Sequence, residues 1–132
     1  MMPPALIGGL AGLLVTALLY MTGMLRERSG MAVLLAAIAF SYPVFAVQAA
    51  AGLPVILLHS AVFVGFAALA THGFKTSTQV LALAIMAHGV FDLITILSGH
   101  PGPHWWPAFC ATLDLAAGGA ILWLVQTRKI PA

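Results

Sequence analysis

The sequence predicts an all-α membrane protein, a polytopic transmembrane bundle of five helices. Of its 132 residues, 62% are hydrophobic and only 6% are charged, whereas a soluble domain has about a quarter charged residues. Five apolar runs each approach the roughly 20 residues that cross a bilayer as a helix. The runs lack the period-two alternation of a membrane barrel strand. Helices satisfy their own backbone hydrogen bonds in lipid, so they are the expected element.

We expect the five helices at about residues 5–25, 31–50, 54–71, 79–97 and 107–126. These segments use nearly the whole chain, so residues 1–132 are predicted to form a single transmembrane domain. The first run contains Gly8 and Gly12 at a spacing of four. A small-residue face of this kind allows another helix to approach closely. His72, Gly73 and Lys75 are expected in a loop, with Thr76, Ser77 or Thr78 as the N-cap of the fourth helix.

The basic residues predict a topology. With five helices, one side of the membrane receives every Lys and Arg, namely Arg26, Arg28, Lys75, Arg128 and Lys129. By the positive-inside rule this side is cytoplasmic, which predicts an outside N-terminus and a cytoplasmic C-terminus in the inner (cytoplasmic) membrane. Trp105 and Trp106 fit an aromatic belt at the outer interface. The expected surroundings are the lipid bilayer, and no nucleic acid partner is expected.

Ionisable side chains interrupt the last two apolar runs at a regular spacing. His88 and Asp92 lie one helical turn apart in the fourth run, and Cys110 and Asp114 lie one turn apart in the fifth. The short loop between the runs makes the two helices antiparallel neighbours, so the two stripes can meet. With the predicted topology, these residues and His59 of the third run all fall in the outer half of the membrane. Ionisable groups at membrane depth indicate a functional site.

Imidazole, thiolate and carboxylate are the ligands of zinc and copper sites in proteins. We therefore expect a transition metal, zinc or copper, in a polar pocket formed by His59, His88, Asp92 and Asp114, with Cys110, His100 and His104 as further candidates. Any chemistry would be metal-assisted, with a water activated by the ion and Asp92 or Asp114 as the base. The sequence does not establish that the protein is an enzyme.

Two alternatives remain open. In the first, Asp92 and Asp114 bond to His88, His59 and Tyr42 as interhelical glue in an accessory subunit of a larger membrane complex. Its partners would be other membrane subunits or further copies of the chain. In the second, His59 holds the iron or magnesium of a haem or another pigment, with the other contacts outside this chain.

The last third of the chain resembles a family of small bacterial integral membrane proteins that has no assigned activity. The resemblance rests on His88-Gly-x2-Asp92, followed by Trp106-Pro107-x2-Cys110-x3-Asp114 and Gly118. It implies that His88, Asp92, Cys110 and Asp114 are signature positions of a shared site. Members often carry adjacent histidines where this chain has Thr95 and Ile96, so the resemblance implies fewer imidazoles here than in those relatives.

Overall fold

The computed structural model describes residues 2–132 and is all-helical over that range. Its elements are α1 (Pro4–Met21), α2 (Ser29–Gln48), α3 (Leu53–Thr76), α4 (Thr78–Ser98) and α5 (Trp106–Gln126). Each helix is long and apolar enough to cross a membrane. The predicted class, an all-α bundle of five candidate spans, is therefore confirmed.

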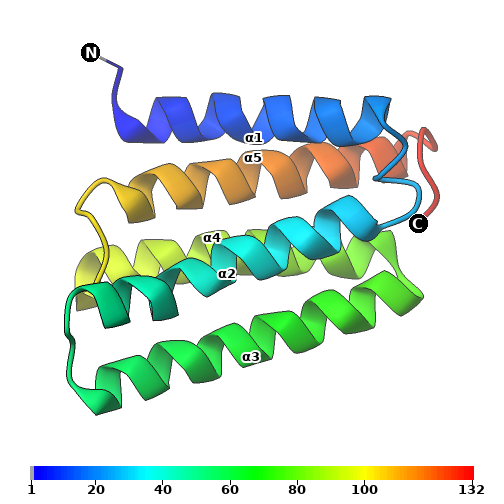
Figure 1. Ribbon diagram of the computed structural model, residues 1–132. Helices are drawn as coiled ribbons and strands as arrows, with labels where there is room; N and C mark the ends of the chain where they lie inside the picture. The colour runs from blue at the N-terminus through cyan, green and yellow to red at the C-terminus, as the bar shows by residue number, and fades with distance from the viewer. Residues whose placement is uncertain (1) are drawn as a thin grey trace.

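Consecutive helices run in opposite directions, with the two termini at opposite ends of the bundle (Figure 1). The last helix, α5, lies between α1 and α4 and packs against both. On the other side, α3 packs against α2 and α4. The fourth and fifth helices are thus extensively packed neighbours, as their short connection predicts.

The two ends of the bundle differ in their connections. One, here called the loop end, carries the α2–α3 turn and the α4–α5 loop (Figure 1). The other, the basic end, carries the α1–α2 connection, the α3–α4 turn and the residues after α5, and with them every Lys and Arg of the chain. There Arg28 Nε donates a hydrogen bond to Thr78 Oγ1 at 3.3 Å. The predicted gathering of the basic residues at one end is confirmed.

Two helix boundaries differ from the expected ones. The third helix continues to Thr76, so His72, Gly73 and Lys75 are helical, and the expected loop over these residues is wrong. A single extended residue, Ser77, suffices for the turn, because its side chain caps α4 by accepting from the backbone N–H groups of Gln79 and Val80. Ser77 was among the predicted caps.

The first helix ends at Met21 rather than at residue 25. Gly23 follows at φ +81°, a left-handed conformation that ends a helix readily because glycine has no Cβ. The chain then folds back and buries Leu25 completely. The early end of α1 therefore contributes an apolar side chain to the core at the basic end.

Glycines allow α5 to approach its two neighbours closely. A Cβ on Gly8 or Gly12 would overlap the backbone carbonyl of Phe109 or Leu113, so the predicted small-residue face of α1 packs on α5. On the other side of α5, a Cβ on Gly89 would lie 3.0 Å from the Cβ of Asp114. This close approach of α4 to α5 positions the site described next.

Candidate metal centre

Four side chains able to bind a metal meet between α4 and α5. They are His88 and Asp92 of α4 and Cys110 and Asp114 of α5, and one potential ligand atom from each lies within 4.8 Å of the others. His88, Asp92 and Asp114 are 0% exposed and Cys110 is 1% exposed. The two stripes predicted from the spacing therefore do face each other.

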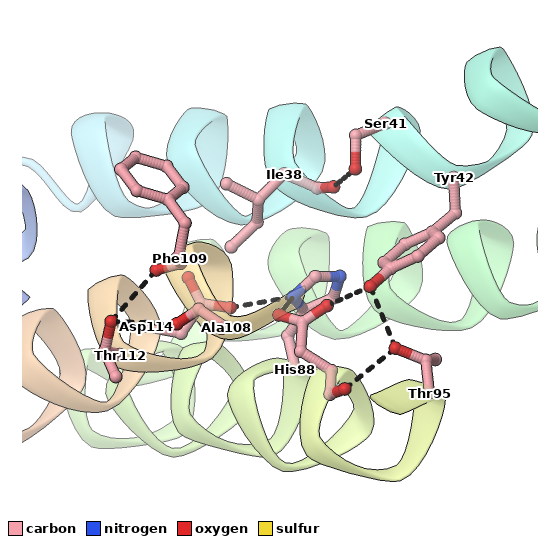
Figure 2. A network of polar contacts seen from close by, with 10 residues as sticks. Ile38, Ser41, Tyr42, His88, Thr95, Ala108, Phe109, Thr112 and Asp114 are labelled. Carbon is pink, nitrogen blue, oxygen red and sulfur yellow. Dashed lines mark hydrogen bonds and ion pairs between the residues drawn. The ribbon is translucent and has the colours of Figure 1, made fainter. Parts of the chain in front are cut away.

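One imidazole nitrogen faces both carboxylates. His88 Nδ1 lies 2.7 Å from Asp114 Oδ2, on the neighbouring helix, and 3.4 Å from Asp92 Oδ2, on its own helix. Figure 2 shows the shorter contact as a bridge between α4 and α5. Two acids from different helices thus converge on a single donor atom.

A tyrosine from α2 completes the arrangement around Asp92. Tyr42 Oη donates a hydrogen bond of 2.6 Å to Asp92 Oδ1 and lies 3.1 Å from Thr95 Oγ1 (Figure 2). The hydroxyl of Thr95 donates in turn to the backbone oxygen of Asp92 at 2.8 Å. Tyr42 is 1% exposed. These contacts orient one carboxylate oxygen of Asp92 toward α2 and leave the other facing His88.

The carboxylates keep unused acceptors in the interior. Asp92 Oδ2 and Asp114 Oδ1 are buried and have no hydrogen-bond partner, and His88 Nε2 has none either. The side chains that contact the two acids through salt bridges and hydrogen bonds include no Lys or Arg. Buried carboxylates without full compensation are strongly unfavourable. A bound cation would supply the missing charge and use the free oxygens.

The donor set fits a transition metal with a small adjustment. Nitrogen, oxygen and sulfur ligands bind Zn²⁺ at about 2.0–2.3 Å in a tetrahedron, which places ligand atoms roughly 3.3–3.8 Å from one another. The present atoms lie within 4.8 Å of one another. The His88–Asp114 contact, at 2.7 Å, would have to open as the ion replaces the shared proton.

The other predicted ligands lie outside this cluster of four. His59 is buried, but its ring stacks on the ring of Tyr42 with centroids 5.3 Å apart and an interplanar angle of 12°. The hydroxyl of Tyr42, not His59, reaches Asp92. His100 is half-buried on the α4–α5 loop, and His104 is exposed. The structure therefore brings together three of the four favoured residues and adds Cys110, which had ranked lower.

The position of Tyr42 beside Asp92 is the part of the site that the sequence did not predict specifically. The sequence suggested Tyr42 only as a bonding partner in the glue alternative. A usable signal existed, because Tyr42 precedes the loop-end terminus of its helix by as many residues as Asp92 does, and so lies at the same depth. Their equal depth predicts that the Tyr42 hydroxyl and the Asp92 carboxylate can meet.

Comparisons of this chain with protein-family models, with curated proteins and with solved structures find no match.

Proposed function

We propose that this membrane protein binds one transition metal ion between α4 and α5 through His88, Asp92, Cys110 and Asp114. The observation that carries the proposal is the convergence of two buried carboxylates on one imidazole nitrogen, with no hydrogen bond to either Asp92 Oδ2 or Asp114 Oδ1. A bound cation would balance this charge. The same four residues are the signature positions of the family resemblance, and we propose that the site is common to that family.

Zinc suits the donor set better than copper. Zinc accepts mixed nitrogen, sulfur and oxygen ligands in a tetrahedral site. Blue-copper centres use two imidazoles with a thiolate, whereas the cluster contains a single His. Tyr42 would act on the metal indirectly, because a hydrogen bond to a ligating carboxylate orients it.

The same four side chains could also support a metal-assisted reaction. If three of the four side chains bind the ion, the remaining position is open to water, which zinc activates at neutral pH. If the side chain left unbound is Asp92 or Asp114, its carboxylate could accept a proton from that water. We therefore propose metal-assisted hydrolysis as the reaction class that the site would support.

We further propose that the basic end is cytoplasmic, since the positive-inside rule places Lys and Arg there. The metal centre would then lie in the outer half of the bilayer. Asp92 lies about 9 Å and Asp114 about 12 Å from the loop end of their helices, at a rise of 1.5 Å per residue. A reporter fused after residue 132 tests this orientation. A green fluorescent protein there should fluoresce, and an alkaline phosphatase should be inactive; the reverse pattern would refute the orientation.

Metal analysis of the purified protein tests the binding proposal. After incubation with zinc and removal of free metal, the wild type should retain one zinc per chain. Asp114→Asn removes a ligand charge with little change in shape and should retain almost none. His72→Ala is the matched control, because His72 is exposed on α3 near the basic end. Equal retention by all three proteins, or none by the wild type with either zinc or copper, would contradict the proposal.

A further inference from the structure

A cavity lies at the loop end, beside the metal centre and separate from it. It has a volume of about 480 Å³, within the range of sites for small molecules. Its walls come from the α2–α3 turn, α3, α4 and the start of the α4–α5 loop. None of the four proposed metal ligands lines it.

Two imidazoles without partners line this cavity. His59, from α3, is 7% exposed, and its Nδ1 is buried without a hydrogen-bond partner. His100, from the loop, likewise has a buried Nδ1 with no partner. A neutral imidazole carries one donor and one acceptor nitrogen. These Nδ1 atoms have almost no accessible surface, so a ligand would meet other parts of each ring first. Two polar rings within largely apolar walls still indicate a ligand with a polar head.

The charge around the cavity indicates that this head is uncharged. The residues lining it include no Lys, Arg, Asp or Glu. Every Lys and Arg of the chain belongs to the opposite, basic end. A phosphate or carboxylate head would therefore lack a permanently charged counter-ion in this cavity. Carbonyl, ester or hydroxyl oxygens need only the hydrogen bonds that imidazoles provide.

The shape of the cavity indicates an apolar tail. It extends from the loop at the helix ends to Val62, which lies about 13 Å along α3 at a rise of 1.5 Å per residue. Leu58 and Ile94 line it and are also 61% and 55% exposed on the outer surface of the bundle. In a bilayer these side chains face hydrocarbon, so the cavity is open to molecules dissolved in the membrane.

We propose that this cavity binds an uncharged membrane amphiphile whose oxygen-bearing head accepts hydrogen bonds from His59 and His100 and whose apolar tail lies along Leu58, Val62 and Ile94. Membranes supply this chemistry from two sources, the ring of a quinone and the ester head of a diacylglycerol. Thr95 lines the cavity and also contacts the hydroxyl of Tyr42, which bonds to Asp92. The bound head would therefore lie close to the metal centre, although its binding does not depend on a metal.

Native mass spectrometry of the full chain, released from neutral detergent micelles, tests this proposal. The probes are decylubiquinone, dioctanoylglycerol and, as an anionic comparison, dioctanoyl phosphatidic acid. We expect one adduct per chain with decylubiquinone or dioctanoylglycerol. The mass of the adduct identifies whether the quinone or the diacylglycerol has bound. Little adduct is expected with the anionic lipid. The adduct should persist in the presence of EDTA, which separates this site from the metal centre.

Two variants and a matched control assign the adduct to the cavity. His59→Phe keeps an aromatic ring on Tyr42 but removes the nitrogens, and should lower the bound fraction about 3- to 10-fold, the effect of losing one hydrogen bond. Val62→Trp fills the deep part of the cavity and should abolish the adduct. The control, His72→Phe, makes the same His-to-Phe substitution at an exposed position of α3 and should leave the bound fraction unchanged. Unchanged binding by both cavity variants, binding of the anionic lipid alone, or no adduct at all would overturn the proposal.

Discussion

The two halves of the bundle bury different chemistry with the same helices. Toward the basic end the core is aliphatic, with Leu25, Met31, Leu81, Ile85 and Ile121 each 0% exposed. From the middle of the bundle toward the loop end, the fully buried side chains include His88, Asp92 and Asp114. Buried polar side chains of the basic half are hydroxyls such as Thr16 and Thr78, which have hydrogen-bond partners.

The contrast between the two halves helps to distinguish side chains that pack the helices from side chains that form a site. The same pair of helices, α4 and α5, is held together in the basic half by apolar contacts such as those of Ile85 and Ile121. The buried acids and the imidazole lie apart from this apolar contact, from mid-helix toward the loop end. We take their clustering to favour a binding role over interhelical glue.

The largest effect is expected from removing the imidazole. His88→Ala leaves two buried carboxylates without their partner and should lower the free energy of unfolding by about 3–5 kcal/mol. Ile85→Val, one turn away in the apolar half, should lower it by only about 0.5–1.5 kcal/mol. Unfolding of both variants by SDS titration measures the difference. Zinc should stabilise the Ile85→Val variant and not the His88→Ala variant; equal stabilisation would remove the distinction between the halves.

A smaller effect is expected from the hydroxyl that orients Asp92. Tyr42→Phe keeps the ring stacked on His59 and removes the hydrogen bond to the carboxylate. Zinc affinity should fall about 10- to 100-fold, the usual effect of losing a hydrogen bond to a ligand. The stoichiometry at saturating zinc should remain one per chain. Competition against a chelating dye measures the affinity, and a wild-type value would show that Tyr42 does not support the centre.

A third effect, on stability and not on zinc affinity, concerns the packing of α1 against α5. Gly12→Ala places a methyl group against the backbone of Leu113, next to Asp114, and should lower stability by about 1–3 kcal/mol. Gly9→Ala is the matched control, because a Cβ there meets nothing within 4 Å. SDS titration of both variants should separate them. Equal stability would mean that the contact between α1 and α5 is looser than the structure indicates.

Much of the fold follows from the sequence, because hydrophobic length and charge placement are local signals. The five spans and the common end of the basic residues were predicted correctly, and the spacing placed His88, Asp92 and Asp114 together. The sequence did not predict correctly that His59 lies outside the cluster. The depth of His59 was predictable, but the direction of its side chain depends on how α3 packs against α2. There Tyr42 stacks on His59 and bonds to Asp92. Such contacts are set by the packing of the whole bundle.

The centre is tested most directly by X-ray absorption at the zinc edge of the zinc-loaded protein. If the four side chains hold the ion, the spectrum should contain one sulfur at about 2.3 Å, from Cys110, together with nitrogen and oxygen ligands at about 2.0–2.2 Å, including one imidazole. Cys110→Ser should remove the sulfur contribution alone. A shell made only of oxygens, without sulfur or imidazole, would place the zinc elsewhere and contradict a metal centre between α4 and α5.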